Sequence, residues 1–214
     1  PLCAKYCDFY KPSIFTVSEL FTPESGRSAL LRNGTAAIVT SIACYYDMPD
    51  PRGVADAIWD ALKPGGVWVV EVADLDQIIA NLAFDTICHE HTEFYRGTHL
   101  FDIARHAGFT LVSAMSDYTN GGSIRYMFRK TEKGSVSSMG RAPSPIDWSG
   151  FRVRITRACD AFKQFLVSEN TRRLICGYGA STKGNVLLQL SGISSELIPV
   201  ILDANPDKDR RETP

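Results

Sequence analysis

The chain has 214 residues, of which 44% are hydrophobic and 22% are charged, as in ordinary soluble globular proteins. Its formal net charge of −1 gives no electrostatic basis for binding nucleic acid or an anionic membrane surface. No stretch approaches the roughly 18 consecutive apolar residues of a membrane span, and no signal segment opens the chain. We therefore expect a cytoplasmic protein with neither a membrane nor a nucleic-acid partner.

The cysteine pattern indicates a reducing compartment. Six cysteines are scattered through the sequence, too sparsely for a disulfide framework: Cys3, Cys7, Cys44, Cys88, Cys159 and Cys176. The first two have a C-x3-C spacing, which is half of a zinc site, but no second pair follows. We expect no metal site here. Both ends of the sequence suggest a fragment of a longer protein.

The first half of the chain predicts alternating strands and helices. Residues 35–43 are apolar and β-rich, as in a buried parallel strand. An amphipathic segment follows and stops at KPGG (63–66), before a second strand at residues 67–73. A helix at residues 97–108 and two strands, FTLVSAMS and SIRYMFRK, complete the pattern. The predicted fold class is α/β with a mostly parallel sheet.

The second half predicts another α/β unit. Residues 131–148 are rich in Ser, Gly and Pro, as in a linker or surface loop, and a helix is expected from about 148 to 168. A strand, a glycine turn and a helix follow, and a further strand ends in Asp203. We therefore expect one domain at residues 1–132 and the start of a second, Rossmann-like domain at residues 133–214.

The end of the first strand is a candidate ligand site. Ligands of open α/β sheets bind at the carboxyl ends of the strands. The sequence TSIACYYDMPDP places four candidate residues there: Ser41, Ile42, Tyr46 and Asp47. The alternative is an ordinary loop between a strand and a helix.

The sequence GYGASTKGN (177–185) is a second candidate. Its small residues let a ligand approach the backbone, and the N-terminus of the next helix favours an anion. Lys183 adds a positive charge, and Asp203 follows the next strand, where Rossmann-like units often place a ribose-binding acid. Thr182 replaces the third glycine of a dinucleotide loop, which argues against the alternative of an NAD-dependent oxidoreductase. A purely structural glycine turn is a further alternative.

The sequence DTICHEHTEFY (85–95) carries the strongest concentration of polar chemistry. His89 and His91 would point the same way in an extended segment, with Glu90 opposite. Three interpretations stay open at this point: acid/base catalysis, a metal site that would still need a third ligand, and a plain polar loop. Further on, TNGGSIRYMF predicts a hairpin turn, or else a backbone loop that lines a substrate pocket.

The order of these motifs resembles the sugar C-methyltransferase family. FDTICHEHTEFY, HAGF, NGGSIRYMF, GYGASTKGNVLLQ and LDANPDKDRRETP occur in that order. Members of this family methylate a carbon of nucleotide-linked keto-deoxysugars with S-adenosylmethionine. The resemblance implies a class I methyltransferase domain, a C-terminal Rossmann-like domain, and the H-E-H segment at the cleft between them.

The resemblance also implies roles for individual residues. His91 is expected as the general base, and Glu90 as its acidic neighbour or as a ligand of a sugar hydroxyl. A hydrogen-bond donor near the enolate oxygen would help the reaction, and His89 or a hydroxyl group is the candidate. Cys88 stands where many members have tyrosine, so no role is transferred there. The candidate residues for the nucleotide sugar are Tyr95, Asn120, Gly121, Gly122, Ser123, Gly179, Ala180, Ser181, Lys183, Asp203 and Asn205.

The sequence departs from the family at its start. The glycine-rich cofactor loop, the ribose-binding acid after the second strand and the cysteine-rich zinc segment are not found before Thr35. The chain thus resembles the C-terminal portion of such an enzyme, with zinc expected only in a preceding segment. A nucleotide-sugar-binding fragment without catalysis is therefore a second functional hypothesis.

Overall fold

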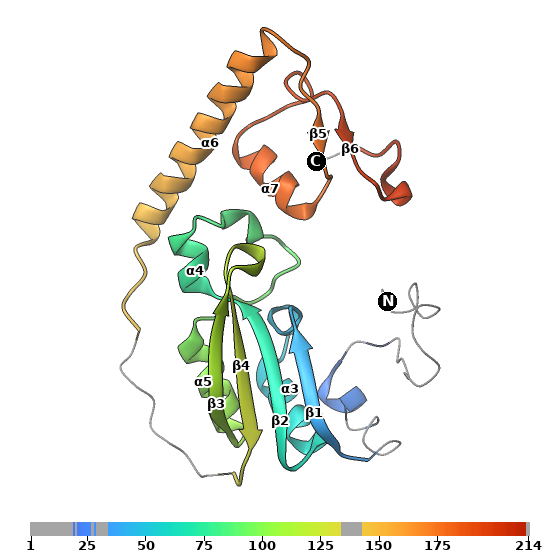
Figure 1. Ribbon diagram of the computed structural model, residues 1–214, viewed down its shortest axis with the longest axis vertical. Coiled ribbons are helices and arrows are strands. Elements are labelled where there is room, and N and C mark those ends of the chain that lie inside the picture. The colour runs from blue at the N-terminus through green and yellow to red at the C-terminus, as the bar shows by residue number, and fades with distance from the viewer. Residues whose placement is uncertain (1–18, 20, 27, 29–33, 134–142, 213–214) are drawn as a thin grey trace. The chain divides into compact units, whose positions relative to one another are not determined.

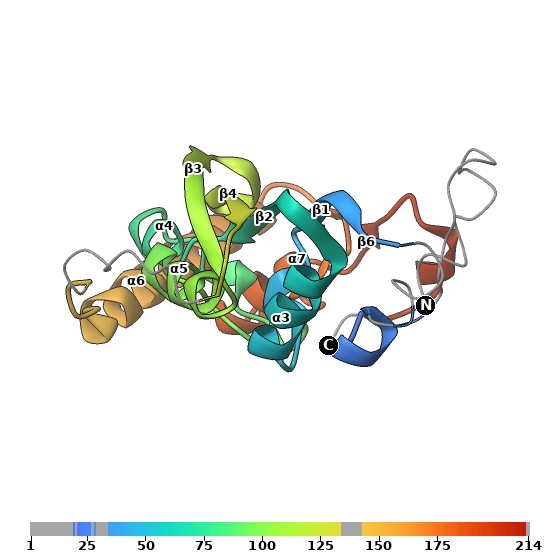
Figure 2. The same cartoon turned by 90° about the horizontal axis from the view of Figure 1, so that it is seen from below.

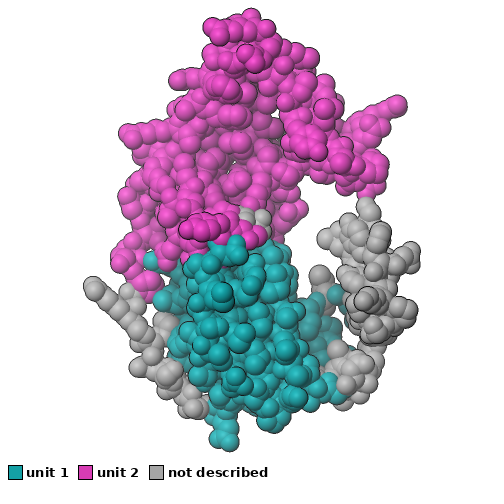
Figure 3. Space-filling model, in the orientation of Figure 1, with its two compact units in different colours: residues 1–72, 95–117, 124–142 teal, residues 73–94, 118–123, 143–214 magenta. Residues whose placement is uncertain are grey.

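The protein forms two compact units, each built from separated stretches of sequence (Figure 3). The computed structural model describes residues 19, 21–26, 28, 34–133 and 143–212. Unit 1 comprises residues 1–72, 95–117 and 124–142, and unit 2 comprises residues 73–94, 118–123 and 143–214. Two short stretches that precede residue 132 thus group with the C-terminal part of the chain. The Cys3–Cys7 spacing lies outside the described residues.

Unit 1 is built on a mixed β-sheet. Among the described residues the strand order is β1-β2-β4-β3, and its neighbours β1 and β2 are parallel. Figure 1 shows β4 running opposite to the other three strands. The strands span Ala36–Ile42 (β1), Leu62–Ala73 (β2), Phe109–Asp117 (β3) and Ser123–Lys130 (β4). The strands expected in the first half are therefore confirmed, within an α/β fold.

The expectation that β1 is buried was wrong. β1 lies at the edge of the described sheet, and Ile38 and Ile42 are 62% and 47% exposed. Val39 and Ser41 alternate with them and face the core. Successive side chains of a strand point to opposite faces of the sheet, and two helices cover the face that Val39 and Ser41 share (Figure 2), so an apolar run alone does not determine burial.

Helices α3 (Pro51–Ala61) and α5 (Gly97–His106) cover one face of this sheet (Figures 1 and 2). Asp50 caps α3, because its Oδ1 accepts the Gly53 N–H at 2.9 Å. The helix ends at Ala61, as the KPGG sequence predicted, and residues 63–66 form an irregularity at the start of β2. Lys130 donates to the carbonyls of Trp59 and Leu62 at this end, and burial lowers the pKa of its amine.

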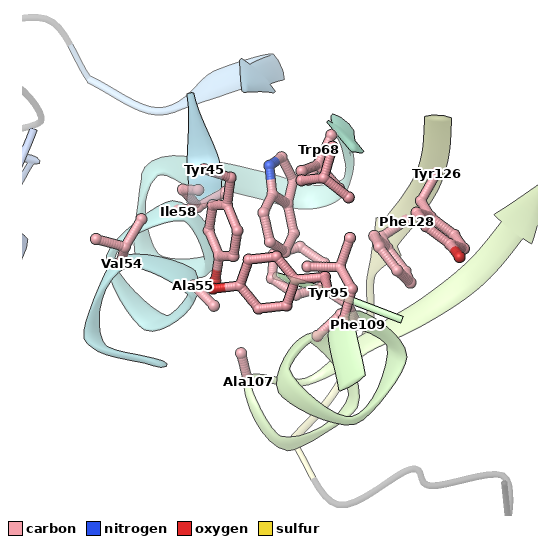
Figure 4. Close-up of a cluster of buried hydrophobic side chains, with 14 of the residues drawn as sticks. Tyr45, Val54, Ala55, Ile58, Trp68, Tyr95, Ala107, Phe109, Tyr126 and Phe128 are labelled. Atoms are coloured by element: carbon pink, nitrogen blue, oxygen red, sulfur yellow. The ribbon is translucent and has the colours of Figure 1, made fainter. Parts of the chain in front are cut away.

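The core of unit 1 is rich in aromatic side chains (Figure 4). Trp68 is fully buried, and its ring centroid lies 5.2 Å from Tyr45, 5.3 Å from Phe109 and 5.6 Å from Phe128. Tilted pairs at these separations add to the stabilisation from buried area. The remaining buried members of the cluster are Val54, Ala55, Ile58, Leu62, Val70, Val72, Tyr95, Leu100, Ala104, Ala107 and Tyr126.

Unit 2 combines short elements with one long helix. Its elements are α4 (Leu75–Ala80), η3 (Phe84–Thr86), η4 (Thr119–Gly121), α6 (Trp148–Asn170), β5 (Gly177–Tyr178), α7 (Thr182–Leu190), β6 (Ile201–Leu202) and η5 (Pro206–Lys208). The predicted helix at 148–168 is thus confirmed. The buried cluster is small: it consists of Ile78, Phe84, Phe151 and Cys159, with Val186 and Leu187 of α7 among the residues packed against it.

The second Rossmann-like domain is not confirmed. The described part of unit 2 contains a parallel pair of two-residue strands, β5 and β6. The apolar side chains expected in buried strands are largely exposed: Leu174 by 74%, Val200 by 48% and Leu202 by 57%. Short strands form here because little apolar surface packs on either side of the pair. Within the described ranges, no helix has both the length and the apolar character to cross a membrane.

Candidate functional site

The predicted cofactor residues lie at the carboxyl end of β1, in unit 1. Ile42 is exposed there, and Tyr46 and Asp47 follow in the short helix η2 (Tyr45–Asp47). Ser41 faces inward instead: it is 5% exposed, and its Oγ accepts the Trp68 Nε1–H at 3.1 Å. Ile42 and Asp47 are therefore exposed, Tyr46 is half-buried against the core of unit 1, and the hydroxyl of Ser41 serves the core.

An ion pair joins a buried carboxylate on the neighbouring strand β2 to a half-exposed arginine on β4. Glu71 of β2 is 6% exposed, and its Oε2 accepts Arg125 Nε at 2.7 Å. Its backbone carbonyl accepts the Ala43 N–H at 3.0 Å, which extends the pairing with β1 by one residue. Ala43 has a φ of 51°, where the chain leaves the strand. The pair thus fixes the carboxyl end of β2, and sequence reasoning assigned it no role.

Tyr95, a predicted substrate residue, belongs to the aromatic core of unit 1. It is 4% exposed, and its ring centroid lies 5.7 Å from that of Tyr45 (Figure 4). Burial raises the pKa of the Tyr45 phenol, whose hydroxyl donates to the Pro51 carbonyl. Packing in the aromatic core therefore accounts for the buried position of Tyr95. Its role as a substrate-binding residue stays a prediction.

The H-E-H segment lies in unit 2 and forms a turn, not the extended segment assumed from the sequence. The His91 N–H donates to the Cys88 carbonyl at 3.2 Å, so the side chains do not alternate as on a strand. The Nδ1 atom of His91 lies 3.5 Å from the Oγ1 of Thr86, which is 2% exposed. The imidazole also meets the Phe94 ring edge to face, at 6.2 Å between centroids. These contacts orient the imidazole.

Glu90 is linked to the glycine turn, which is far away in sequence. The Oγ1 of Thr182 donates to the Glu90 Oε2 at 3.3 Å, across 92 residues of chain. Thr182 opens α7, and Ser181 caps this helix by accepting the Gly184 N–H at 3.0 Å. Helix α7 also packs against η3, which precedes the H-E-H segment. The structure therefore brings Glu90 and the start of α7 together. No local sequence pattern had indicated this contact.

Asp203 holds the glycine turn from the other side. Its Oδ2 accepts the Ala180 N–H at 2.8 Å and the Lys208 Nζ at 2.9 Å, and its Oδ1 accepts the Asn205 N–H at 2.8 Å. These bonds, that from Asn205 first, lower the pKa of Asp203 to about 2. The structure thus brings together the predicted residues Gly179, Ala180, Asp203 and Asn205. The carboxylate of Asp203 accepts its hydrogen bonds from other residues of the protein.

The Asn-Gly-Gly loop packs against α4 within unit 2. The Gly121 carbonyl accepts Asn81 Nδ2 at 2.9 Å, and the Gly122 carbonyl accepts the Asp74 N–H at 3.1 Å. Both glycines have positive φ, and a Cβ on Gly122 would lie 2.5 Å from the Gln77 Cβ. Close approach to α4 therefore requires glycine here. Asn120 lies in η4, and Ser123 is buried with its Oγ donating to Thr119 O at 3.1 Å.

Several residues near these groups were missed by sequence reasoning. Thr86, Thr182 and Lys208 contact His91, Glu90 and Asp203; they lie within the quoted motifs, but sequence reasoning assigned them no role in the site. Asn185 on α7 has a buried Oδ1 that lacks a hydrogen-bond partner among the described residues. His89 and Lys183 lie in the turns at Glu90 and at the start of α7. In the part of the chain that the structure describes, no three His, Cys, Asp or Glu side chains are arranged to hold a metal ion.

Comparison with known proteins matches both halves of the chain. Residues 10–114 match the family model of a methyltransferase domain, and residues 118–214 match that of the C-methyltransferase C-terminal domain. The C-methyltransferase NovU of Streptomyces niveus is 26% identical over 197 residues, which cover 86% of this chain and 46% of NovU. The chain thus spans about half the length of this relative.

Solved methyltransferase structures match part of the chain at low similarity. An O-methyltransferase family protein of Burkholderia thailandensis has a TM-score of 0.40 and 16% identity, covering 57% of this chain and 36% of its own. The N-methyltransferase NodS of Bradyrhizobium japonicum WM9, in complex with S-adenosyl-L-homocysteine, has a TM-score of 0.33 and 18% identity, covering 55% of this chain and 50% of its own. The two family models together account for residues 10–114 and 118–214, so the chain is identified as a methyltransferase domain followed by a C-methyltransferase C-terminal domain.

Proposed function

We propose that the protein takes part in S-adenosylmethionine-dependent methylation of a carbon in a nucleotide-linked keto-deoxysugar, with His91 as the general base. The observation that carries this proposal is the arrangement of the H-E-H turn. A buried hydroxyl orients the imidazole of His91, and the start of α7 holds the neighbouring carboxylate of Glu90. The family match supplies the reaction class.

The chemistry begins with a proton transfer. A ketone acidifies the C–H bond beside it, and a neutral imidazole takes that proton. The electron pair of the C–H bond then forms the enolate, whose negative charge lies on the former carbonyl oxygen. We assign the base to Nε2 of His91, because Nδ1 faces the hydroxyl of Thr86. His89, in the same turn, is the candidate donor to the enolate oxygen.

Glu90 supports this base from the adjacent position. A carboxylate next to an imidazole stabilises the imidazolium that forms when the proton is taken. It also accepts a hydrogen bond from a sugar hydroxyl. Because Thr182 donates to Oε2, the carboxylate keeps one orientation before substrate binds.

The surface residues at the carboxyl end of β1 fit one wall of a cofactor site. Ile42 offers apolar contact, and Tyr46 and Asp47 offer polar groups to a ribose or an amine. Ser41 does not fit this role, because its Oγ already accepts the Trp68 indole N–H in the core. S-adenosylmethionine, when bound, supplies an electrophilic methyl group on a sulfonium. With this cofactor bound, the enolate carbon would take the methyl group and the sulfur would keep the electron pair of the broken S–C bond.

The substrate site is assigned to the glycine turn and its surroundings. Residues 179–183 present small side chains, a helix N-terminus and the positive charge of Lys183, which suit the phosphates of a nucleotide sugar. The residues Asn205 and 120–123 are further candidates for the same ligand.

The base is tested by proton exchange that needs no methyl donor. Nucleoside-diphosphate-linked keto-deoxysugars are incubated with the enzyme in D2O, and NMR follows loss of the proton beside the ketone. We expect His91→Asn to slow both this exchange and methyl transfer by about 10²- to 10⁴-fold. Binding of S-adenosylhomocysteine, measured by calorimetry, should persist.

A matched control is His106→Asn. His106 lies in α5 of unit 1, where its Nδ1 is 2.7 Å from the Asp102 carbonyl, so this variant should keep the exchange rate. Unchanged exchange and turnover in the His91→Asn variant would remove His91 from the role of base. Binding of the nucleotide sugar with no exchange in the wild-type enzyme would favour a non-catalytic binding role.

A further inference from the structure

We infer that Thr182 is a positioning residue for Glu90, and that it couples the start of α7 to the acid/base turn. This inference rests on the proposed function. It concerns one hydrogen bond, from the Thr182 hydroxyl to the Glu90 Oε2 at 3.3 Å. A carboxylate accepts and a hydroxyl donates, so the direction of this bond is unambiguous while Glu90 is ionised.

The partners of this bond are anchored on both sides. Thr182 is the first residue of α7, and Val186, one turn later on the same helix face, packs against the cluster that contains Phe84. Phe84 begins η3, the element that leads into the H-E-H turn, and α7 packs against η3. The hydroxyl of Thr182 is therefore held toward Glu90 by packing that does not depend on the bond itself.

The charge of the helix end acts in the same direction. The N-terminus of a helix carries a partial positive charge, which favours an anionic side chain beside its first turn. Glu90 meets α7 at its first residue, where that field is strongest. The contact therefore favours the orientation of the carboxylate that Thr182 selects.

The hydrogen bond between Thr182 and Glu90 links the proposed substrate site to the proton-transfer step. Residues 179–183 form the proposed phosphate-binding turn, and within this turn Thr182 contacts Glu90 of the acid/base segment. A ligand that orders the turn would also order Glu90 beside His91. Thr182 thus acts through Glu90 on the proton-transfer step, and its loss should lower kcat more than it raises KM.

The test compares Thr182→Val, which loses the hydroxyl at nearly constant shape, with Thr182→Ser, which keeps it. We expect Thr182→Val to lower the rate of proton exchange and the kcat of methyl transfer about tenfold, the scale of a hydrogen bond to a charged group. KM should change by less than about twofold, and Thr182→Ser should retain most of the rate. Thr156→Val is the matched control, because its hydroxyl donates to the Arg152 carbonyl on the exposed side of α6.

A double-mutant cycle with Glu90→Gln separates positioning from general destabilisation. If Thr182 acts through Glu90, then Thr182→Val has little further effect in the Glu90→Gln background. A full, additive loss in that background would overturn the inference, as would a wild-type rate for Thr182→Val. Circular dichroism of each variant verifies the fold.

A spectroscopic measurement keeps this inference separable from the proposed function. The ¹³C resonance of the Glu90 side-chain carboxyl should shift in Thr182→Val and stay in place in Thr182→Ser and Thr156→Val. This result is independent of turnover. If His91 proves not to be the base, the shift of the Glu90 resonance would still be expected. If the resonance does not move in Thr182→Val, the hydrogen bond between Thr182 and Glu90 is refuted, even if His91 is the base.

Discussion

Units 1 and 2 hold their residues in place by different means. Unit 1 has a large buried cluster centred on Trp68 and its aromatic neighbours. Unit 2 has a small cluster, and its turns are joined by side-chain hydrogen bonds: Thr182 to Glu90, Asn81 to Gly121, and Asp203 to Ala180. Apolar packing is non-directional, whereas hydrogen bonds fix orientations. The proposed acid/base and substrate residues lie in the unit where orientation is determined by polar contacts.

Truncation of the aromatic core tests the first half of this comparison. Trp68→Ala should lower the free energy of unfolding of unit 1 by about 3–5 kcal/mol, because it opens a cavity and leaves the Ser41 hydroxyl without its donor. Urea denaturation followed by circular dichroism measures this loss. Trp148→Ala is the control, since Trp148 is 55% exposed. If Trp68→Ala lowers the free energy of unfolding by less than Trp148→Ala does, unit 1 is not stabilised mainly by its aromatic core.

Removal of the Glu71–Arg125 ion pair tests whether unit 1 also depends on polar contacts. Arg125→Met leaves the 6% exposed Glu71 without its partner, while the arginine side chain is 48% exposed. Because solvent compensates part of the loss, we expect about 1–2 kcal/mol of destabilisation at neutral pH. Arg129→Met, which removes a surface bond to the Gly65 carbonyl, should cost less. Equal urea midpoints for the two variants would argue against a specific role of the pair.

Removal of an unpaired buried hydroxyl should raise the free energy of unfolding, whereas the two preceding changes should lower it. The Thr98 Oγ1 is buried without a hydrogen-bond partner among the described residues of unit 1. Thr98→Val removes this polar atom and keeps the shape, so it should raise the free energy of unfolding by up to about 1 kcal/mol. The control Thr110→Val loses a surface contact to Thr131 and should not stabilise. Destabilisation by Thr98→Val would indicate that the hydroxyl has a partner in solution.

The pH dependence of unit 2 should show the smallest effect. The pKa of Asp203 is lowered in the folded chain to about 2, from about 3.9 when unfolded. The carboxylate therefore stabilises the fold above about pH 4, and this contribution is lost as the pH falls toward 2. Urea midpoints between pH 4 and pH 2 should fall less steeply for Asp203→Asn than for wild type. Asp209→Asn, at an exposed pair, should keep the wild-type slope.

Much of the secondary structure followed from local pattern. The β-rich runs predicted β1 to β4, and helical spacing of apolar residues predicted α3, α5 and α6. The prolines and glycines of KPGG marked the end of α3. These features depend on residues that are neighbours in sequence, so one sequence suffices to find them. The motif order also led to the C-methyltransferase family, which the family models confirm.

The candidate site was only partly predictable. The sequence singled out His91, Glu90 and the glycine turn, but it placed H-E-H on an extended segment, where the structure has a turn. It also treated Ser41 as a ligand residue, whereas Trp68 takes its hydroxyl into the core. The Ser41 difference arises because its partner lies on another strand, and the H-E-H difference arises because a backbone hydrogen bond from His91 to Cys88 closes a turn.

The sequence by itself determined the elements, the family and the residue types available for proton transfer. Tertiary structure decided which of them meet. Thr182 and Glu90 are separated by 92 residues and come together because α7 packs against η3 through the cluster around Phe84. Periodicity and turn chemistry act over a few residues, whereas such a pairing depends on burial of apolar faces that are distant in the chain.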